Sequence, residues 1–199
     1  NNCNKMKKIF VLIFLLNFNF SFGQKYQVEN VVVYAWEDVI HANPDTIYGI
    51  SFSKLKLAKL PDELKLFRRL KVLDVSKNKL AELPDFIDEF HFLEHLNLEK
   101  NKLINFPVRV CKDTSLRFLR LGKNLFETLP NSIELLTNLE YLDLYDTPVL
   151  SFPETLVKLT GLKEIDLTGI RFSASFQESW TKKLPNTHFV FDSPCDCFD

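Results

Sequence analysis

Residues 70–92 read LKVLDVSKNKLAELPDFIDEFHF, and this stretch decides the fold because its apolar pattern recurs along the chain. Leu70 is followed three and five positions on by Leu73 and Val75, and this triplet returns every 23 residues without insertion or deletion. The six copies begin at Ile47, Leu70, Leu93, Leu116, Leu139 and Leu162. A fixed period of this length predicts a solenoid, in which each coil buries its apolar face against its neighbours.

Other positions are equally regular when the first leucine of each copy is counted as position 1. Positions 11, 14 and 18 are apolar in the first five copies, and position 15 is proline in the same five. These prolines are Pro61, Pro84, Pro107, Pro130 and Pro153. The fixed φ of proline can start a short helical or extended stretch on the outer side of a coil. The sixth copy has Ser175 and Ser179 at positions 14 and 18 and lacks the proline.

Position 9 is asparagine in three consecutive copies, at Asn78, Asn101 and Asn124, with Thr147 and Ile170 in the next two. An inward amide at a sharp bend can bond the backbone groups that the adjacent coil leaves unpaired. The three residues therefore predict a structural ladder of side-chain amides.

The combined pattern LxxLxLxxNxLxxLPxxIxxL resembles the leucine-rich repeat family, in the form typical of bacterial secreted proteins and of the Ras-suppressor-like class. The resemblance covers about residues 47–182. It implies an α/β solenoid, with a parallel sheet on the concave side of an arc and short helical or irregular segments on the convex side. The family implies little about the ligand.

The ends of the chain complete the expected organisation, because a solenoid needs caps over its terminal coils. Around Trp36 the apolar residues have helical spacing, and a second short helix is expected from Ser179 to Lys183, followed by a strand from His188 to Phe191. Trp180 is expected to cover the core. The predicted parts are a signal peptide in residues 1–23, an N-terminal cap in 24–46, six repeats in 47–182 and a C-terminal cap strand with a cysteine-containing tail in 183–199.

A lysine-rich start, an apolar run over residues 9–16 and the small residues Ser21 and Gly23 have the three parts of a secretory signal, with Met6 as the expected start. The run is too short to span a bilayer, which requires about 20 apolar residues; a retained membrane anchor is the alternative. We therefore predict a secreted or periplasmic protein, with membrane contact only through this segment.

Removal of residues 1–23 takes away three lysines, so that 22 basic residues face 26 acidic ones and the formal net charge changes from −1 to −4. A mildly acidic chain without a basic stripe does not indicate nucleic-acid binding. Three cysteines remain, Cys111, Cys195 and Cys197. Cys111 is expected to be a buried small hydrophobic residue, and the other two to form a tail that is free or paired between molecules.

Catalytic and metal motifs are missing from the sequence. His91 and His95 are four residues apart, which on a helix would suit zinc, but here they fall at the end of one coil and in the next strand. The sequence has five glycines, and they form neither a phosphate-binding loop nor a nucleophile elbow. We therefore expect no enzyme activity, no metal and no cofactor.

The concave face can be assigned from the repeat, because alternate residues of a strand point to opposite sides. Positions 3, 5 and 7 of the central copies supply the candidate partner-binding residues His95, Asn97, Phe118, Arg120, Tyr141, Asp143 and Tyr145. A charged rim is predicted beside them from Lys54, Lys77, Lys100, Lys123, Asp146, Glu164 and Asp166. Aromatic residues together with arginine are typical of binding hot spots. The competing interpretation is that the aromatic residues only support the sheet and that the lysines are simply solvated.

These observations predict a non-catalytic protein-binding module that recognises a protein or peptide on its concave face. Two alternatives stay open. One is envelope glycan binding, in which Tyr141 and Phe118 would stack on sugar rings. The other is a structural or self-associating envelope protein.

Overall fold

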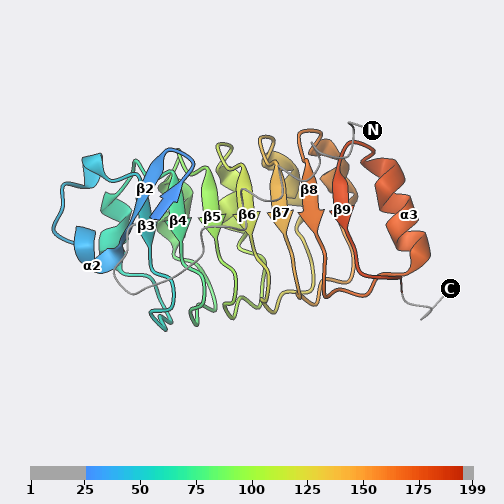
Figure 1. Ribbon diagram of the computed structural model, residues 1–199, viewed down its shortest axis with the longest axis horizontal. Coiled ribbons are helices and arrows are strands. Elements are labelled where there is room, and N and C mark those ends of the chain that lie inside the picture. The colour runs from blue at the N-terminus through green and yellow to red at the C-terminus, as the bar shows by residue number, and fades with distance from the viewer. Residues whose placement is uncertain (1–25, 195–199) are drawn as a thin grey trace, which may run out of the picture.

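One sheet runs through the whole of the described chain, residues 26–194, in the computed structural model (Figure 1). Its strands follow one another in sequence order, and all neighbours are parallel except the first pair, which forms an antiparallel hairpin. The strands are β1 (Tyr26–Val28), β2 (Val31–Ala35), β3 (Gly49–Ser51), β4 (Val72–Asp74), β5 (His95–Asn97), β6 (Phe118–Arg120), β7 (Tyr141–Asp143), β8 (Glu164–Asp166) and β9 (His188–Val190). The predicted parallel solenoid is confirmed.

The register of the sheet follows the sequence period. Leu73 of β4 lies beside Leu96 of β5, and Leu119 of β6 beside Leu142 of β7, so from β3 to β8 each residue pairs with the one 23 positions away. Equivalent positions of successive coils therefore form straight rows across the sheet. Hydrogen bonds between coils continue past the short strands, as when the Lys77 backbone N–H donates to the Glu99 carbonyl at 2.8 Å.

The outer side of each regular coil carries a 3-10 helix that begins just after the repeated proline. The helices are η2 (Asp62–Leu66), η3 (Asp85–Glu89), η4 (Val108–Lys112), η5 (Asn131–Leu135) and η6 (Glu154–Lys158). Pro61 precedes η2 with φ −68°, and its carbonyl accepts a hydrogen bond from the Leu64 backbone N–H. The proline is thus the extended residue that directly precedes the helical turn, and its ring fixes the φ angle at that point.

Apolar side chains from every coil fill the space between the sheet and the 3-10 helices. The burial of equivalent positions is regular. At position 21 of four coils an apolar side chain is buried, namely Phe67, Phe90, Leu136 and Leu159. The third coil has Asp113 at this position, and it is buried too. Burial raises the pKa of Asp113 to about 6.

The same third coil buries Cys111, as expected for a small hydrophobic residue, and burial raises the pKa of its thiol. Cys195 and Cys197, and the expected signal peptide in residues 1–23, lie outside the described residues. Among residues 26–194, no helix is both long enough and apolar enough to cross a lipid bilayer.

Three asparagines join consecutive coils through their side chains. The Asn101 amide donates to the carbonyls of Val75 in the preceding coil and Leu98 in its own, both at 3.0 Å, and its oxygen accepts from the Leu80 backbone N–H at 3.1 Å. Asn78 and Asn124 make the equivalent bonds one coil earlier and one coil later. Each amide satisfies backbone groups that are buried at the turn.

Aromatic residues cover both ends of the described solenoid. At the first coil, helix α2 (Trp36–Val39) places the Trp36 ring on Phe52, with centroids 4.8 Å apart. At the last, helix α3 (Ala174–Lys183) buries Trp180 against Phe152 at 5.2 Å. Helix α3 begins earlier than predicted, because Ser173 caps it and no proline interrupts the sixth coil.

Candidate binding face

The concave face consists of the side chains at positions 3, 5 and 7 of the strands, which point away from the core. Along position 3 a row of rings crosses three strands. The ring centroids of His95 and Phe118 are 4.3 Å apart and the two rings are stacked with nearly parallel planes, whereas the centroids of Phe118 and Tyr141 are 6.4 Å apart. The sheet register produces this row, because it places His95, Phe118 and Tyr141 side by side.

Cationic groups lie over two rings of this row and over Tyr145 at position 7. The guanidinium carbon of Arg117 is 5.2 Å from the Phe118 centroid, and that of Arg120 is 5.9 Å from the Tyr141 centroid. The Lys123 ammonium is 4.9 Å from the Tyr145 centroid. These cation–π contacts restrict the rings and the cations to defined positions.

Position 5 has a backbone role that the sequence did not reveal. In β5 the Asn97 side-chain oxygen accepts from the Glu99 backbone N–H at 3.0 Å, and in β7 Asp143 accepts from Tyr145 at 2.9 Å. The same bond is made at position 5 by Ser51, Asp74 and Asp166. Five of the six coils thus use position 5 to close the turn that follows the strand.

Arg120 is the exception at position 5, because a guanidinium has no hydrogen-bond acceptor and cannot make this bond. Its coil also has Gly122 at position 7, where an added Cβ would lie 2.9 Å from the Asp143 carboxylate and 3.0 Å from the Tyr145 carbonyl. Arg120 and Gly122 therefore depart together from the pattern of the other coils, on the strand that also carries Phe118.

Not all of the predicted contact residues are accessible. His95 and Asp143 are both 8 % exposed, whereas Asn97, Phe118 and Tyr145 are half-buried. Burial raises the pKa of Asp143 to about 6 and lowers that of His95 to about 4, so the imidazole is neutral at pH 7. His95 and Asp143 therefore support the face more than they contribute contact area to it.

The predicted lysine rim is a row of left-handed turn residues. Lys77, Lys100 and Lys123 have φ between 55 and 58°, and Asp146 has 51°. Lys54 and Gly169 complete the row, with φ of 66° and 80°. The row changes from lysine to acid and glycine towards the C-terminus, as predicted, but members of the row form ion pairs. The Lys100 ammonium lies 2.8 Å from Glu99, and the Lys123 ammonium 3.3 Å from Asp146.

A charge ladder at position 2 was missed by the sequence analysis. Lys71, Glu94, Arg117, Glu140 and Lys163 occupy one row with alternating sign. The Arg117 side chain donates to Glu140 at 2.8 Å and thereby lowers the pKa of that carboxyl. Glu140 consequently does not add to the acidic character of the C-terminal coils. The signal was present in the sequence, since these residues are spaced by the repeat period.

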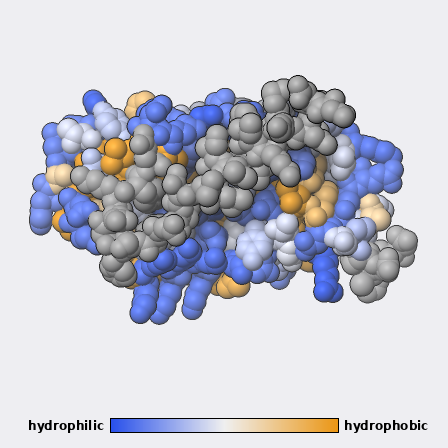
Figure 2. All heavy atoms as spheres, viewed as in Figure 1, coloured by the Kyte–Doolittle hydropathy of each residue, from blue (hydrophilic) through white to orange (hydrophobic). Residues whose placement is uncertain are grey.

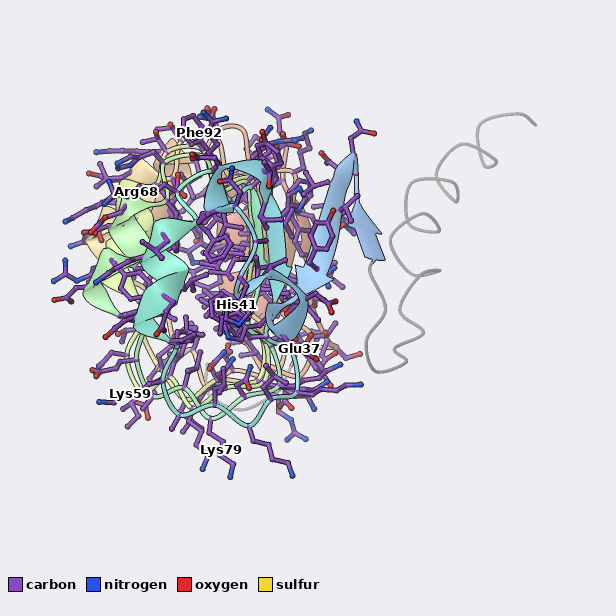
Figure 3. The ribbon with its side chains drawn as sticks, turned by 90° about the vertical axis from the view of Figure 1, so that its left-hand side faces the viewer. Glu37, His41, Lys59, Arg68, Lys79 and Phe92 are labelled. Atoms are coloured by element: carbon purple, nitrogen blue, oxygen red, sulfur yellow. The ribbon has the colours of Figure 1, made fainter. Side chains whose placement is uncertain are left out.

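The β1–β2 hairpin lies on the concave side, and Figure 3 shows it across the sheet from the outer 3-10 helices. At Gly49 an added Cβ would lie 2.8 Å from the Val32 carbonyl oxygen, so glycine permits the close approach of β2. The turn of the hairpin brings a Glu29 carboxylate oxygen to 3.8 Å from Nε2 of His95 and the other to 3.6 Å from Arg117. Position 3 of the first coils is therefore adjacent to the hairpin.

Hydrophilic side chains project from the lower edge of the molecule, below the strands (Figure 2). This edge holds the turns that follow the strands, and Lys59 and Lys79 mark it in Figure 3. Both lysines are exposed. The basic character of the N-terminal coils thus extends from the lysine rim onto this edge.

Comparison with known proteins agrees with this architecture. Residues 52–188 match the family described as a leucine-rich repeat region. The chain belongs to the leucine-rich repeat family. Members of this family are typically non-catalytic and are commonly used for protein binding. A search of curated proteins gave no match.

Two solved structures are similar to this leucine-rich repeat protein. A leucine-rich repeat protein from Leptospira interrogans is 27% identical, with a TM-score of 0.58 over 74% of this chain and 43% of that chain. An internalin from Listeria monocytogenes is 16% identical, with a TM-score of 0.60 over 75% of this chain and 44% of that chain, and shows the fold alone. This chain thus spans less than half of the length of either protein.

Proposed function

We propose that the concave face of the fourth and fifth coils binds a protein partner, with Phe118, Arg120, Tyr141 and Tyr145 as its central contacts. The observation that carries this proposal is the departure of β6 from the repeat. Position 5 serves the backbone in the other five coils, whereas in β6 it carries Arg120. A backbone bond has been replaced there by a cation beside aromatic rings.

The composition of this region suits a binding hot spot. Tyrosine and arginine are enriched among residues that contribute most to protein interfaces, and preordered side chains lose less entropy on binding. Arg120 lies over Tyr141, and Lys123 over Tyr145, so these groups are already restricted. Asn97 completes the contact set as a half-buried polar neighbour.

The rim gives the interface a direction. Lys54, Lys77 and Lys100 lie toward the N-terminal coils, and Asp146, Glu164 and Asp166 toward the C-terminal ones. Such a distribution steers and orients a partner of complementary polarity. Glu164 of this rim also contacts His188, since Nδ1 of the histidine lies 3.1 Å from the Glu164 carboxylate.

The test is a pull-down from the native envelope and the surrounding medium, using the chain from Gln24 as the mature form of a secreted or periplasmic protein. The bait is compared with the double variant Phe118→Ala, Arg120→Ala and with Phe92→Ala. Phe92 is exposed and lies outside the concave face, so its removal tests the general loss of a phenylalanine (Figure 3). All three baits are first matched by circular dichroism.

A partner that is retained by the wild type and by Phe92→Ala, but not by the double variant, supports the proposal. With that partner purified, Phe118→Ala alone is expected to weaken binding by about 2 kcal/mol or more. If all baits retain the same proteins, the aromatic row serves only to pack the sheet and the proposal is wrong.

Glycan binding is the second candidate, and the row of rings from Phe118 to Tyr141 is the observation that favours it. Envelope saccharides would then change the tyrosine fluorescence of the wild type, and the change would be reduced in Tyr141→Ala. Self-association, the third alternative, would give a dimer of the purified protein that is linked through the tail cysteines and is separated by a reducing agent.

A further inference from the structure

Three side chains from two distant parts of the sequence meet where the hairpin reaches the concave face. Glu29 belongs to the hairpin turn, whereas Glu94 and His95 lie at the beginning of β5. One carboxylate oxygen from each glutamate and one nitrogen of His95 all lie within 4.8 Å of one another. Nε2 of His95 and Oε1 of Glu29 are 3.8 Å apart.

The histidine in this group is held in place by packing, but one of its ring nitrogens makes no hydrogen bond within the described part of the chain. Its ring stacks on Phe118 at a centroid distance of 4.3 Å and an interplanar angle of 6°, and the residue is only 8 % exposed. Within residues 26–194, Nε2 of His95 is buried and has no hydrogen-bond partner. Buried polar atoms in native proteins are usually paired, so an unpaired imidazole nitrogen facing two carboxylates requires an explanation.

We propose that Glu29, Glu94 and His95 bind one divalent transition-metal ion, of which Zn²⁺ is the best fit. Imidazole nitrogen and carboxylate oxygen are both zinc ligands, and three protein ligands leave a fourth position for water. An imidazole ligand also favours zinc over Mg²⁺ and Ca²⁺, which bind through oxygen. The proposed site departs from the expectation of no metal, which was based on the sequence spacing of His91 and His95.

Binding requires only a local contraction. Zinc–ligand bonds are about 2.0–2.2 Å long, so the ligand atoms must approach one another more closely than in the arrangement described. The Glu29 side chain is 45% exposed and sits on a hairpin turn, whereas that of His95 is 11% exposed and packed. Glu29 is therefore the ligand that moves, and His95 is the fixed one.

Two cations compete for the same carboxylates. The Lys71 ammonium lies 2.7 Å from Oε1 of Glu94, so the metal must take the other Glu94 oxygen or displace this lysine, and Arg117 lies near both glutamates. Nη1 of Arg117 lies 3.6 Å from Glu29 and 3.9 Å from Glu94, while its Nε donates to Glu140 at the shorter distance of 2.8 Å. Glu140 can keep Arg117 in place when the other two carboxylates turn to the metal. The ion would then tie the hairpin to the third coil, directly beside Phe118. This inference does not depend on the proposed partner binding.

The test is titration calorimetry of the untagged full chain with Zn²⁺ alone, after treatment with a chelator. All samples carry Cys195→Ser and Cys197→Ser, so the tail cysteines cannot supply ligands. We expect one ion per chain and no measurable binding of Mg²⁺. Glu29→Gln and His95→Gln should each weaken Zn²⁺ binding by about tenfold or more, since losing even an outer-shell partner of a metal ligand has effects of this size.

The matched control is His188→Gln. It removes the other histidine–glutamate pair of the described residues, His188 with Glu164, and should leave Zn²⁺ binding unchanged. Zn²⁺ should also raise the melting temperature of the wild type and not that of Glu29→Gln, which alters an exposed side chain and is expected to fold. Absence of Zn²⁺ binding, equal affinity in Glu29→Gln and wild type, or loss of binding only in His188→Gln would each overturn the proposal.

Discussion

The second to fourth coils and the last two coils are joined to their neighbours in different ways. In the former, Asn78, Asn101 and Asn124 connect backbone groups of adjacent coils. In the fifth coil Thr147 occupies the same position, and its hydroxyl donates only within its own coil, to the Leu144 carbonyl at 2.7 Å. In the sixth coil Ile170 has no polar side-chain group at all.

Aromatic packing takes the place of the amide ladder in the C-terminal coils. Phe152 contacts Phe172, Phe176 and Trp180 with centroid distances of 5.2 to 5.8 Å. Pro148 follows Thr147 and has no N–H to donate, and the backbone pairs instead through a bridge between Thr128 and Ser151. The contrast shows that a solenoid coil can be fixed either by satisfying its turn or by covering it with apolar surface.

The largest expected effect comes from removing the cover of the C-terminal coils. Trp180→Ala deletes a side chain that is 4 % exposed and packs on two phenylalanines, and should lower the free energy of unfolding by about 3–5 kcal/mol. Urea denaturation measures this change. Phe92→Ala removes an exposed ring and should stay within about 0.5 kcal/mol of wild type. A similar loss for both variants would contradict the assignment of Trp180 as the cap.

Asn101→Ala tests the ladder and should cost about 1–3 kcal/mol, because buried backbone groups of two coils lose their partner. Thr147→Ala removes a single hydrogen bond and should cost about 0.5–1.5 kcal/mol. Parallel denaturation curves of the two variants decide the comparison. Equal costs would mean that the two regions are joined in the same way.

Asp113 is the polar exception within the ladder region, and it predicts a pH dependence. Its folded-state pKa of about 6 lies above the usual value of about 3.9 for an unfolded chain, so the folded protein binds the proton more tightly. The stability contributed by the protonated carboxyl is complete below pH 4 and is lost as the pH rises through 6, to a total of up to about 3 kcal/mol.

Asp113→Leu restores the apolar residue found at this position in the other regular coils and should remove this pH dependence. Thermal unfolding of both proteins between pH 4 and 7 measures it. The wild type should become less stable relative to the variant as the pH rises, and parallel profiles would show that Asp113 does not titrate in this range.

The smallest effect is expected for the position-2 charge ladder, which runs through both regions. Lys71→Ala and Lys163→Ala each remove one end of the ladder, from side chains that are 43% and 72% exposed. Partly exposed ion pairs contribute about 0–1 kcal/mol, so both variants should stay close to wild type and to each other. Their unfolding midpoints at low and high salt measure the difference. A large loss at only one end would show that the ladder belongs to one region.

The repeat was predictable because burial in a stacked coil forces the same residue type at the same position. Leu73, Leu96 and Leu119 face one core, and the period alone assigned them to it. The concave face followed from the same register, which placed Phe118 beside Tyr141 as expected. The accessibility of its members did not follow, since His95 and Asp143 are buried despite lying on that face.

The backbone roles of some polar residues were also beyond the sequence pattern. Asn97 and Asp166 were interpreted as contact or rim residues, but their oxygens close turns two residues on. Lys77 and its equivalents have a left-handed φ. Sequence indicates such a backbone conformation when the residue is glycine or asparagine, but not when it is lysine. A repeat period shows which residues occupy equivalent positions. It does not show which backbone groups require a hydrogen bond from a side chain.

The sequence by itself determined the solenoid, its register and the rows of side chains, because these depend on contacts between residues a fixed 23 positions apart. Only the tertiary structure decided where the N-terminal hairpin lies. Glu29 precedes the first repeat, so the repeat period does not relate it to His95, and the approach of the two side chains depends on the packing of β2 over Gly49. Contacts of this kind arise from the shape of the folded surface, and no local pattern in the chain encodes them.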